Sequence, residues 1–132
     1  MSFEDFLKRV DSYKQIDEGG HRAVFDIGNG LVLKKAIDVH TDLADSKAVN
    51  ISEYNLYQQA EDKGYLCPAL WVSKDGMYLI MKNANVLAKP ATKQSVDEFI
   101  LYLVSLGNEE YDLNSPANWV GHYLVDYGLP FN

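Results

Sequence analysis

The strongest structural signal in the sequence is a β-hairpin in its first third. Residues 23–27 and 31–37 are rich in strand-forming residues, and Gly28-Asn29-Gly30 joins them. Glycine and asparagine tolerate the backbone of a tight turn, so this pattern predicts two antiparallel strands. A second hairpin is predicted from residues 66–72 and 77–82, which flank a Lys-Asp-Gly turn.

Helical patterns alternate with these hairpins. Residues 47–61 predict a helix that ends before Gly64, and residues 40–46 predict a loop. The string Ser95-Val96-Asp97-Glu98 has the form of a capping box, which predicts a helix from Ser95 to Gly107. A first helix is predicted after Ser2, because four apolar residues follow at helical spacing: Phe3, Phe6, Leu7 and Val10.

The order of the predicted elements favours an α+β fold. A further strand near residues 13–16 would complete a five-stranded antiparallel sheet that carries one helix. A last short hairpin is predicted around a Gly121-His122 turn. The length of 132 residues fits one domain with one core.

Composition excludes several classes of function. The net charge is −7 and no run of Lys or Arg occurs, which argues against nucleic-acid binding. No apolar run is long enough to cross a membrane, so we expect no membrane partner. Cys67 is the single cysteine, which excludes an internal disulfide and fits a cytoplasmic location.

Two charged residues do not fit their apolar surroundings. Glu53 shares a helical stripe with Val49, Leu56 and Ala60, and Lys34 lies in an apolar strand. Glu53 could sit at the edge of its stripe and reach water, which is the commoner behaviour of a carboxylate. Alternatively, a Lys34–Glu53 ion pair would accommodate both residues, because a buried charge needs a partner.

Three further groups of polar or glycine residues could serve a site or a turn. Gly19-Gly20 could let backbone N–H groups approach phosphates, or could form an ordinary turn. Asn118 and Asp126 flank the last hairpin and could supply oxygen ligands to Mg²⁺, or could be a loop residue and a turn residue. Asp112 could accept a proton from a hydroxyl group, or could cap a turn.

Taken in order, these motifs resemble the protein-kinase-like fold, and in particular the very short kinase-like proteins of bacteriophages. The resemblance covers residues 13–129. It implies an N-lobe at residues 1–82 and a strongly truncated C-lobe at residues 83–132. The chain departs from the family pattern in having two adjacent glycines where the family has three spaced ones.

The resemblance also implies roles for individual residues around ATP and Mg²⁺. Lys34 would pair with the nucleotide phosphates and Glu53 would hold Lys34. Asp112 would be the catalytic base, and Asn118 and Asp126 would hold the metal. The remaining nucleotide contacts would come from Gly19, Gly20, Val24, Met81 and Asn83, with backbone groups of residues 82–84 facing adenine.

Two functions follow as expectations. The first is a minimal Mg·ATP-binding kinase-like protein, with phosphotransfer as a possible activity and Asp112 and Lys34 as its catalytic residues. The alternative is a non-catalytic kinase-like module that engages or inhibits a bacterial host protein, in which Lys34–Glu53 is a structural ion pair. Either protein would act in the cytoplasm, which for a phage protein is that of the host.

Overall fold

A computed structural model describes residues 13–18, 21–39, 42–87, 90–108, 113–125 and 127 of the chain. The predicted helix after Ser2 lies outside these residues. The elements, in chain order, are β1 (Lys14–Glu18), β2 (Arg22–Gly28), β3 (Leu31–Ala36), α2 (Leu43–Gln59), β4 (Ala69–Val72), β5 (Tyr78–Lys82), the 3-10 helix η2 (Ala84–Val86), α3 (Lys93–Ser105), the 3-10 helix η3 (Pro116–Asn118), β6 (Trp119–Val120) and β7 (Tyr123–Leu124).

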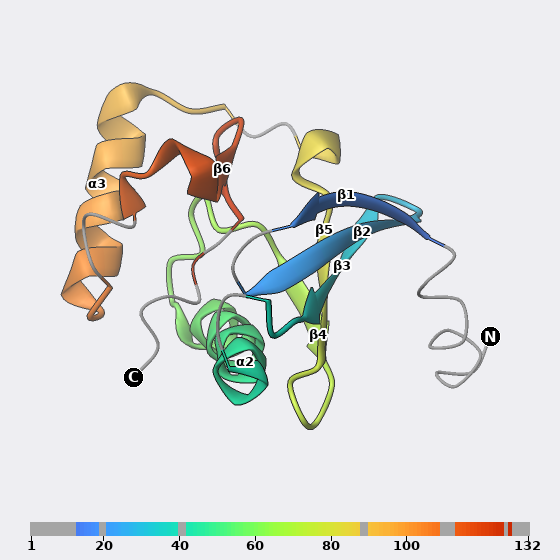
Figure 1. The fold of residues 1–132 in the computed structure, drawn as a ribbon. Coiled ribbons are helices and arrows are strands. Elements are labelled where there is room, and N and C mark those ends of the chain that lie inside the picture. Colours follow the sequence, from blue (N-terminus) through green and yellow to red (C-terminus); the bar gives the residue numbers. More distant parts are fainter. Residues whose placement is uncertain are drawn as a thin grey trace.

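The centre of the fold is a five-stranded antiparallel sheet with the strand order β1-β2-β3-β5-β4. Helix α2 lies against one face of the sheet, and the β6–β7 hairpin lies between the sheet and α3 (Figure 1). The predicted α+β class and the five-stranded antiparallel sheet are therefore confirmed. The arrangement is compatible with a kinase-like N-lobe.

The turn between β2 and β3 has the backbone that its sequence predicts. Gly28, Asn29 and Gly30 have φ angles of 81°, 55° and 73°. Residues with a Cβ rarely adopt these angles, and Asn is among the few that do so readily. The turn sets the register in which Val24 lies opposite Lys34.

Both long helices begin earlier than the sequence analysis predicts. Asp42 accepts a hydrogen bond from the Ala44 amide at 2.8 Å, so α2 begins at Leu43 and the loop predicted for residues 43–46 is wrong. Thr92 caps α3 and accepts a bond from the Ser95 amide at 3.1 Å. Ser95 is therefore the third residue of the helix and not its cap.

Alternation along the strands gives the sheet two apolar faces. Val32, Leu79 and Met81 point toward α2 and join one buried cluster that extends to Leu103 of α3 and to Leu124. Ala23, Phe25 and Leu33 form a second buried cluster on the opposite face. The first cluster joins the sheet to the C-terminal part of the chain.

Backbone hydrogen bonds attach the last hairpin to the segment before β4. The Leu124 amide donates to the Tyr65 carbonyl at 2.8 Å, and the Cys67 amide donates to the Leu124 carbonyl at 2.9 Å. The Trp119 indole nitrogen donates to the Leu113 carbonyl at 2.7 Å. These bonds fix the position of β7, which Val125 follows directly in the chain.

Alanine at Gly76 should destabilise the protein more than alanine at Gly28. Both glycines have φ near 80°, but a Cβ at Gly76 would lie 2.5 Å from the Lys47 carbonyl oxygen, whereas one at Gly28 would meet nothing within 4 Å. We expect Gly28→Ala to cost about 1–2 kcal/mol and Gly76→Ala about 2–4 kcal/mol, measured by urea unfolding. Equal losses of stability in the two variants would contradict the close approach of α2 to the β4–β5 turn that contains Gly76.

Candidate functional site

The Glu53 carboxylate lies at the centre of a buried polar network. The residue is 0% exposed, so the interpretation that it reaches water at the edge of its helix is wrong. Its Oε2 accepts hydrogen bonds from Lys34 Nζ at 2.9 Å and Arg22 Nη1 at 2.5 Å. Its Oε1 accepts from Arg22 Nη2 at 3.3 Å and from the Tyr127 amide at 2.8 Å. The predicted Lys34–Glu53 ion pair is confirmed.

Three elements bring these charges together. Lys34 of β3 lies opposite Val24 of β2, and both side chains point to the face that α2 covers. Arg22 lies two residues before Val24, so it shares this face. Lys34 is 3% exposed and Arg22 is 7% exposed, so water screens their interaction with Glu53 very little.

Asn50, one helical turn before Glu53, extends the network to the β4–β5 turn. Its Oδ1 accepts from Arg22 Nη1 at 3.2 Å, and its Nδ2 donates to the Gly76 carbonyl at 2.8 Å. Sequence reasoning assigned no role to Arg22 or Asn50. Starting the predicted strand one residue earlier would have placed Arg22 on the same face as Lys34, and the three-residue spacing places Asn50 on the face of Glu53.

Val125 and Tyr127, which follow β7 in the chain, both bond to this network. Lys34 Nζ donates to the Val125 carbonyl, and the Tyr127 amide donates to Glu53. The Val125 amide donates in turn to the Asn118 carbonyl at 2.8 Å, which brings Asn118 to the same region. The predicted metal ligand Asp126 lies between Val125 and Tyr127 in the sequence but outside the described residues.

Of the other predicted site residues, Val24, Met81 and Asn83 are described by the structure. Val24 and Met81 lie on the same sheet face as Lys34, with Met81 1% exposed in the core. Asn83 caps η2, and its side chain accepts the Asn85 amide at 3.0 Å. Gly19, Gly20 and Asp112 lie outside the described residues.

Residues 82–84 were expected to offer backbone groups to adenine, and two of their amides are already bonded inside the protein. The Lys82 amide donates to the Pro68 carbonyl at 2.9 Å, and the Asn83 amide donates to the Gly30 carbonyl at 2.8 Å. These two N–H groups therefore do not fit the adenine-binding role in this conformation.

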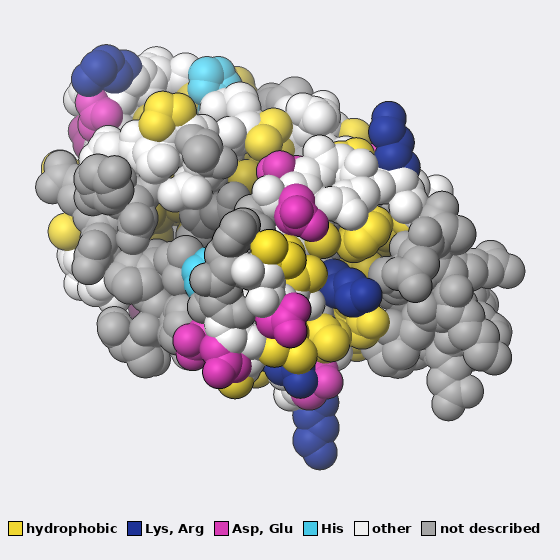
Figure 2. Space-filling view, viewed as in Figure 1, with side chains coloured by type: hydrophobic (Ala, Val, Ile, Leu, Met, Phe, Trp, Pro, Cys, Tyr) yellow, Lys and Arg dark blue, Asp and Glu magenta, His cyan; other side chains and the backbone are white. Residues whose placement is uncertain are grey.

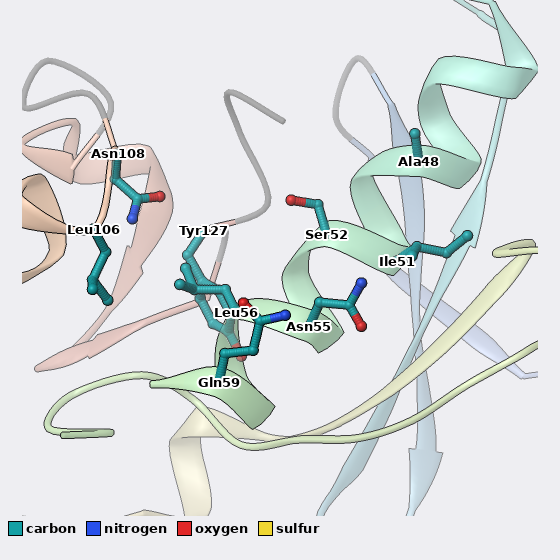
Figure 3. Close-up of a pocket in the computed structure, with 10 residues that line it drawn as sticks. Ala48, Ile51, Ser52, Asn55, Leu56, Gln59, Leu106, Asn108 and Tyr127 are labelled. Atoms are coloured by element: carbon teal, nitrogen blue, oxygen red, sulfur yellow. The ribbon is translucent and has the colours of Figure 1, made fainter. Parts of the chain in front are cut away.

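A pocket of about 480 Å³ lies between α2 and the end of α3, and none of the predicted nucleotide contacts that the structure describes lines it (Figure 3). Ser52, Asn55 and Gln59 line it from α2, and Leu106 and Asn108 line it from the end of α3. Tyr127 forms part of its wall, so this residue borders the pocket and contacts Glu53 as well.

Burial also shifts the acid–base behaviour of two groups beside the network. Burial raises the pKa of the Cys67 thiol to about 12, and raises the pKa of Tyr127 well above its usual value. The Tyr127 hydroxyl donates to the Cys67 carbonyl at 2.7 Å, so the two groups belong to one packed unit. Both remain protonated at neutral pH.

The face of the protein shown in Figure 2 carries both acidic and basic side chains. Figure 2 shows Asp and Glu side chains spread over the visible face, with Lys and Arg side chains between them. Among the described residues, no group of three His, Cys, Asp or Glu side chains is placed to hold a metal ion. None of the described helices has both the length and the apolar character needed to cross a membrane.

Comparison of the chain with protein-family models, with curated proteins and with solved structures finds no match.

Replacing Glu53 with Gln should strongly destabilise the protein. The change removes the anion that Arg22 and Lys34 share, and leaves both cations buried without it. We expect a loss of about 3–5 kcal/mol in the free energy of unfolding, measured by urea titration. The exposed Glu61 provides a control, since Glu61→Gln should change stability by less than about 0.5 kcal/mol. If Glu53→Gln lost no more stability than Glu61→Gln, the buried charge network around Glu53 would be contradicted.

The free energy of unfolding should fall as the pH rises above 9. The Cys67 thiol ionises near pH 9 in the unfolded chain but near 12 in the folded one, so the unfolded state loses its proton first. At pH 10 we expect a loss of about 1 kcal/mol relative to pH 8, measured by urea unfolding at each pH. Cys67→Ala should flatten this slope, and an unchanged slope in that variant would contradict the assignment.

Proposed function

We propose that the chain is a minimal kinase-like protein that binds a nucleotide with Mg²⁺ on the α2 face of its sheet. The observation that carries the proposal is the buried Lys34–Glu53 ion pair, with the ends of the 125–127 segment bonded to both of its members. A strand lysine held by a helix glutamate is the arrangement by which protein kinases position nucleotide phosphates.

The place of Asp126 in the sequence supports the proposal that the chain binds Mg²⁺. Asp126 is covalently bonded to Val125 and Tyr127, whose backbone groups bond to Lys34 and Glu53. Asn118 contacts the same segment through Val125. A carboxylate and an amide oxygen would hold Mg²⁺ together with phosphate oxygens and water.

The described residues fit a nucleotide in part. Lys34 and Glu53 form the ion pair that the phosphate-binding role requires, and the Asn118 backbone bonds to Val125 in the same region. The amides of Lys82 and Asn83 do not fit the adenine-binding role, because carbonyl groups of the protein already occupy them. The resemblance further implies phosphotransfer with Asp112 as the base, and Asp112 lies outside the described residues.

The occupied amides also favour a second candidate, a non-catalytic kinase-like module that engages a bacterial host protein. In that case the Lys34 ammonium, which bonds to Glu53 and to the Val125 carbonyl, only holds the fold together. The two functions differ in whether Lys34 has a ligand outside the chain.

Thermal unfolding with and without Mg·ATP tests the nucleotide proposal. At a free concentration about 100-fold above Kd, a ligand that binds only the folded state adds about 2.7 kcal/mol of stability. We expect Mg·ATP to raise the Tm of the native protein and of Lys35→Met, but not that of Lys34→Met. Lys35 is the matched control, because it is the neighbouring lysine on the opposite face of β3.

Two outcomes count against the nucleotide proposal. A native Tm that Mg·ATP at millimolar concentration leaves unchanged would overturn it and favour the binding module. Equal stabilisation of Lys34→Met and of the native protein would show that the nucleotide binds elsewhere.

A further inference from the structure

We infer that Arg22 is a positioning residue that holds the Glu53 carboxylate in place, so that Lys34 can exchange this carboxylate for an anionic ligand. The ligand part of this inference rests on the proposed nucleotide site, where the anion is a phosphate group. Arg22 itself contacts no ligand in this scheme. It acts through Glu53.

The two cations hold Glu53 in different ways. Arg22 reaches both carboxylate oxygens, through Nη1 at 2.5 Å and Nη2 at 3.3 Å, and Nη1 also donates to Asn50 Oδ1 at 3.2 Å. Lys34 reaches one oxygen, at 2.9 Å, and also donates to the Val125 carbonyl. Arg22 thus has the more extensive and more strongly oriented contact with Glu53.

The chemistry of the two side chains also suits Arg22 to hold Glu53 and Lys34 to be released. A guanidinium is a planar group whose paired N–H donors match a carboxylate, whereas an ammonium is a compact charge on a flexible stem that can redirect its donors. Two cations beside one carboxylate also repel each other, which weakens the hold of Glu53 on Lys34. Arg22 therefore makes Lys34 easier to release.

The release of Lys34 also leaves Glu53 well satisfied. When a buried carboxylate loses its only cation, the folded protein is strongly destabilised. Here, after Lys34 turns away, Glu53 keeps both Arg22 bonds and the Tyr127 amide. A lysine–glutamate pair without Arg22 would resist this exchange, because it would expose the carboxylate to the full cost of an unpaired buried charge.

The first test measures how readily Lys34 leaves Glu53, and it requires no nucleotide. Acylation of lysines by acetic anhydride, followed by mass spectrometry of each lysine, reports how readily the Lys34 amine becomes free. In Arg22→Met, Glu53 keeps Lys34 and the Tyr127 amide but loses both guanidinium bonds, so we expect Lys34 to be held more firmly and to react several-fold more slowly than in the native protein. Lys35, in the same peptide, provides the internal reference, and its rate should not change. A Lys34 rate equal to or faster than the native one would overturn the inference.

Stability provides a second measurement that is independent of nucleotide. Arg22→Met removes the guanidinium bonds to Glu53 and to Asn50, while Lys34→Met leaves Glu53 with Arg22. We expect the unfolding equilibrium constant to rise about tenfold more in Arg22→Met than in Lys34→Met. An equal or larger rise in Lys34→Met would show that Lys34 is the structural cation.

Nucleotide affinity separates positioning from a purely structural role. At a temperature where each variant is folded, we expect Arg22→Met to weaken Mg·ATP binding about tenfold or more, and Arg22→Lys to restore only part of it, because lysine keeps the charge but not the paired donors. Unchanged affinity in folded Arg22→Met would overturn the positioning role. If the native protein binds no Mg·ATP, the proposed function fails, and the acylation and stability results still decide whether Arg22 holds Glu53.

Discussion

The fold depends on one desolvated carboxylate. Glu53 links β2 through Arg22, β3 through Lys34 and the C-terminal segment through the Tyr127 amide, while its own helix lies on the sheet. A carboxylate without water is tolerated only when several donors surround it. Its burial therefore requires that all three parts of the chain be in place at the same time, and the apolar cluster on the same face packs around that arrangement.

The strands were predictable because their signals are local. Alternating apolar residues and the Gly-Asn-Gly turn identify β2 and β3 without reference to the rest of the chain, and the sheet follows from repeating such hairpins. Helix α2 was harder to read. It buries Ser46, Asn50 and Glu53 beside Val49, so its covered face is mostly polar and gives little amphipathic signal. For this reason the sequence alone left open whether Glu53 faces water or the core.

Residues of the candidate site could be predicted only where a charged residue interrupts an apolar sequence pattern. Lys34 and Glu53 stood out because each is charged within an apolar pattern, and pairing them resolved both conflicts. Arg22 stood at the edge of a predicted strand, where a charge is unremarkable, and its burial depends on the position of α2, which no local pattern reveals. The bonded amides of Lys82 and Asn83 are likewise tertiary contacts, made by Pro68 and by the β2–β3 turn.

The position of Tyr127 along the chain has a consequence for how the protein reaches its folded state. The bond from its amide to Glu53 spans 74 residues, and the bond from its hydroxyl to the Cys67 carbonyl spans 60. Such distant contacts form slowly, because long loops must close before any interaction compensates for the lost chain entropy. During synthesis, the sheet and α2 can therefore assemble early, but their central carboxylate cannot gain its full set of donors until the chain has been extended to residue 127.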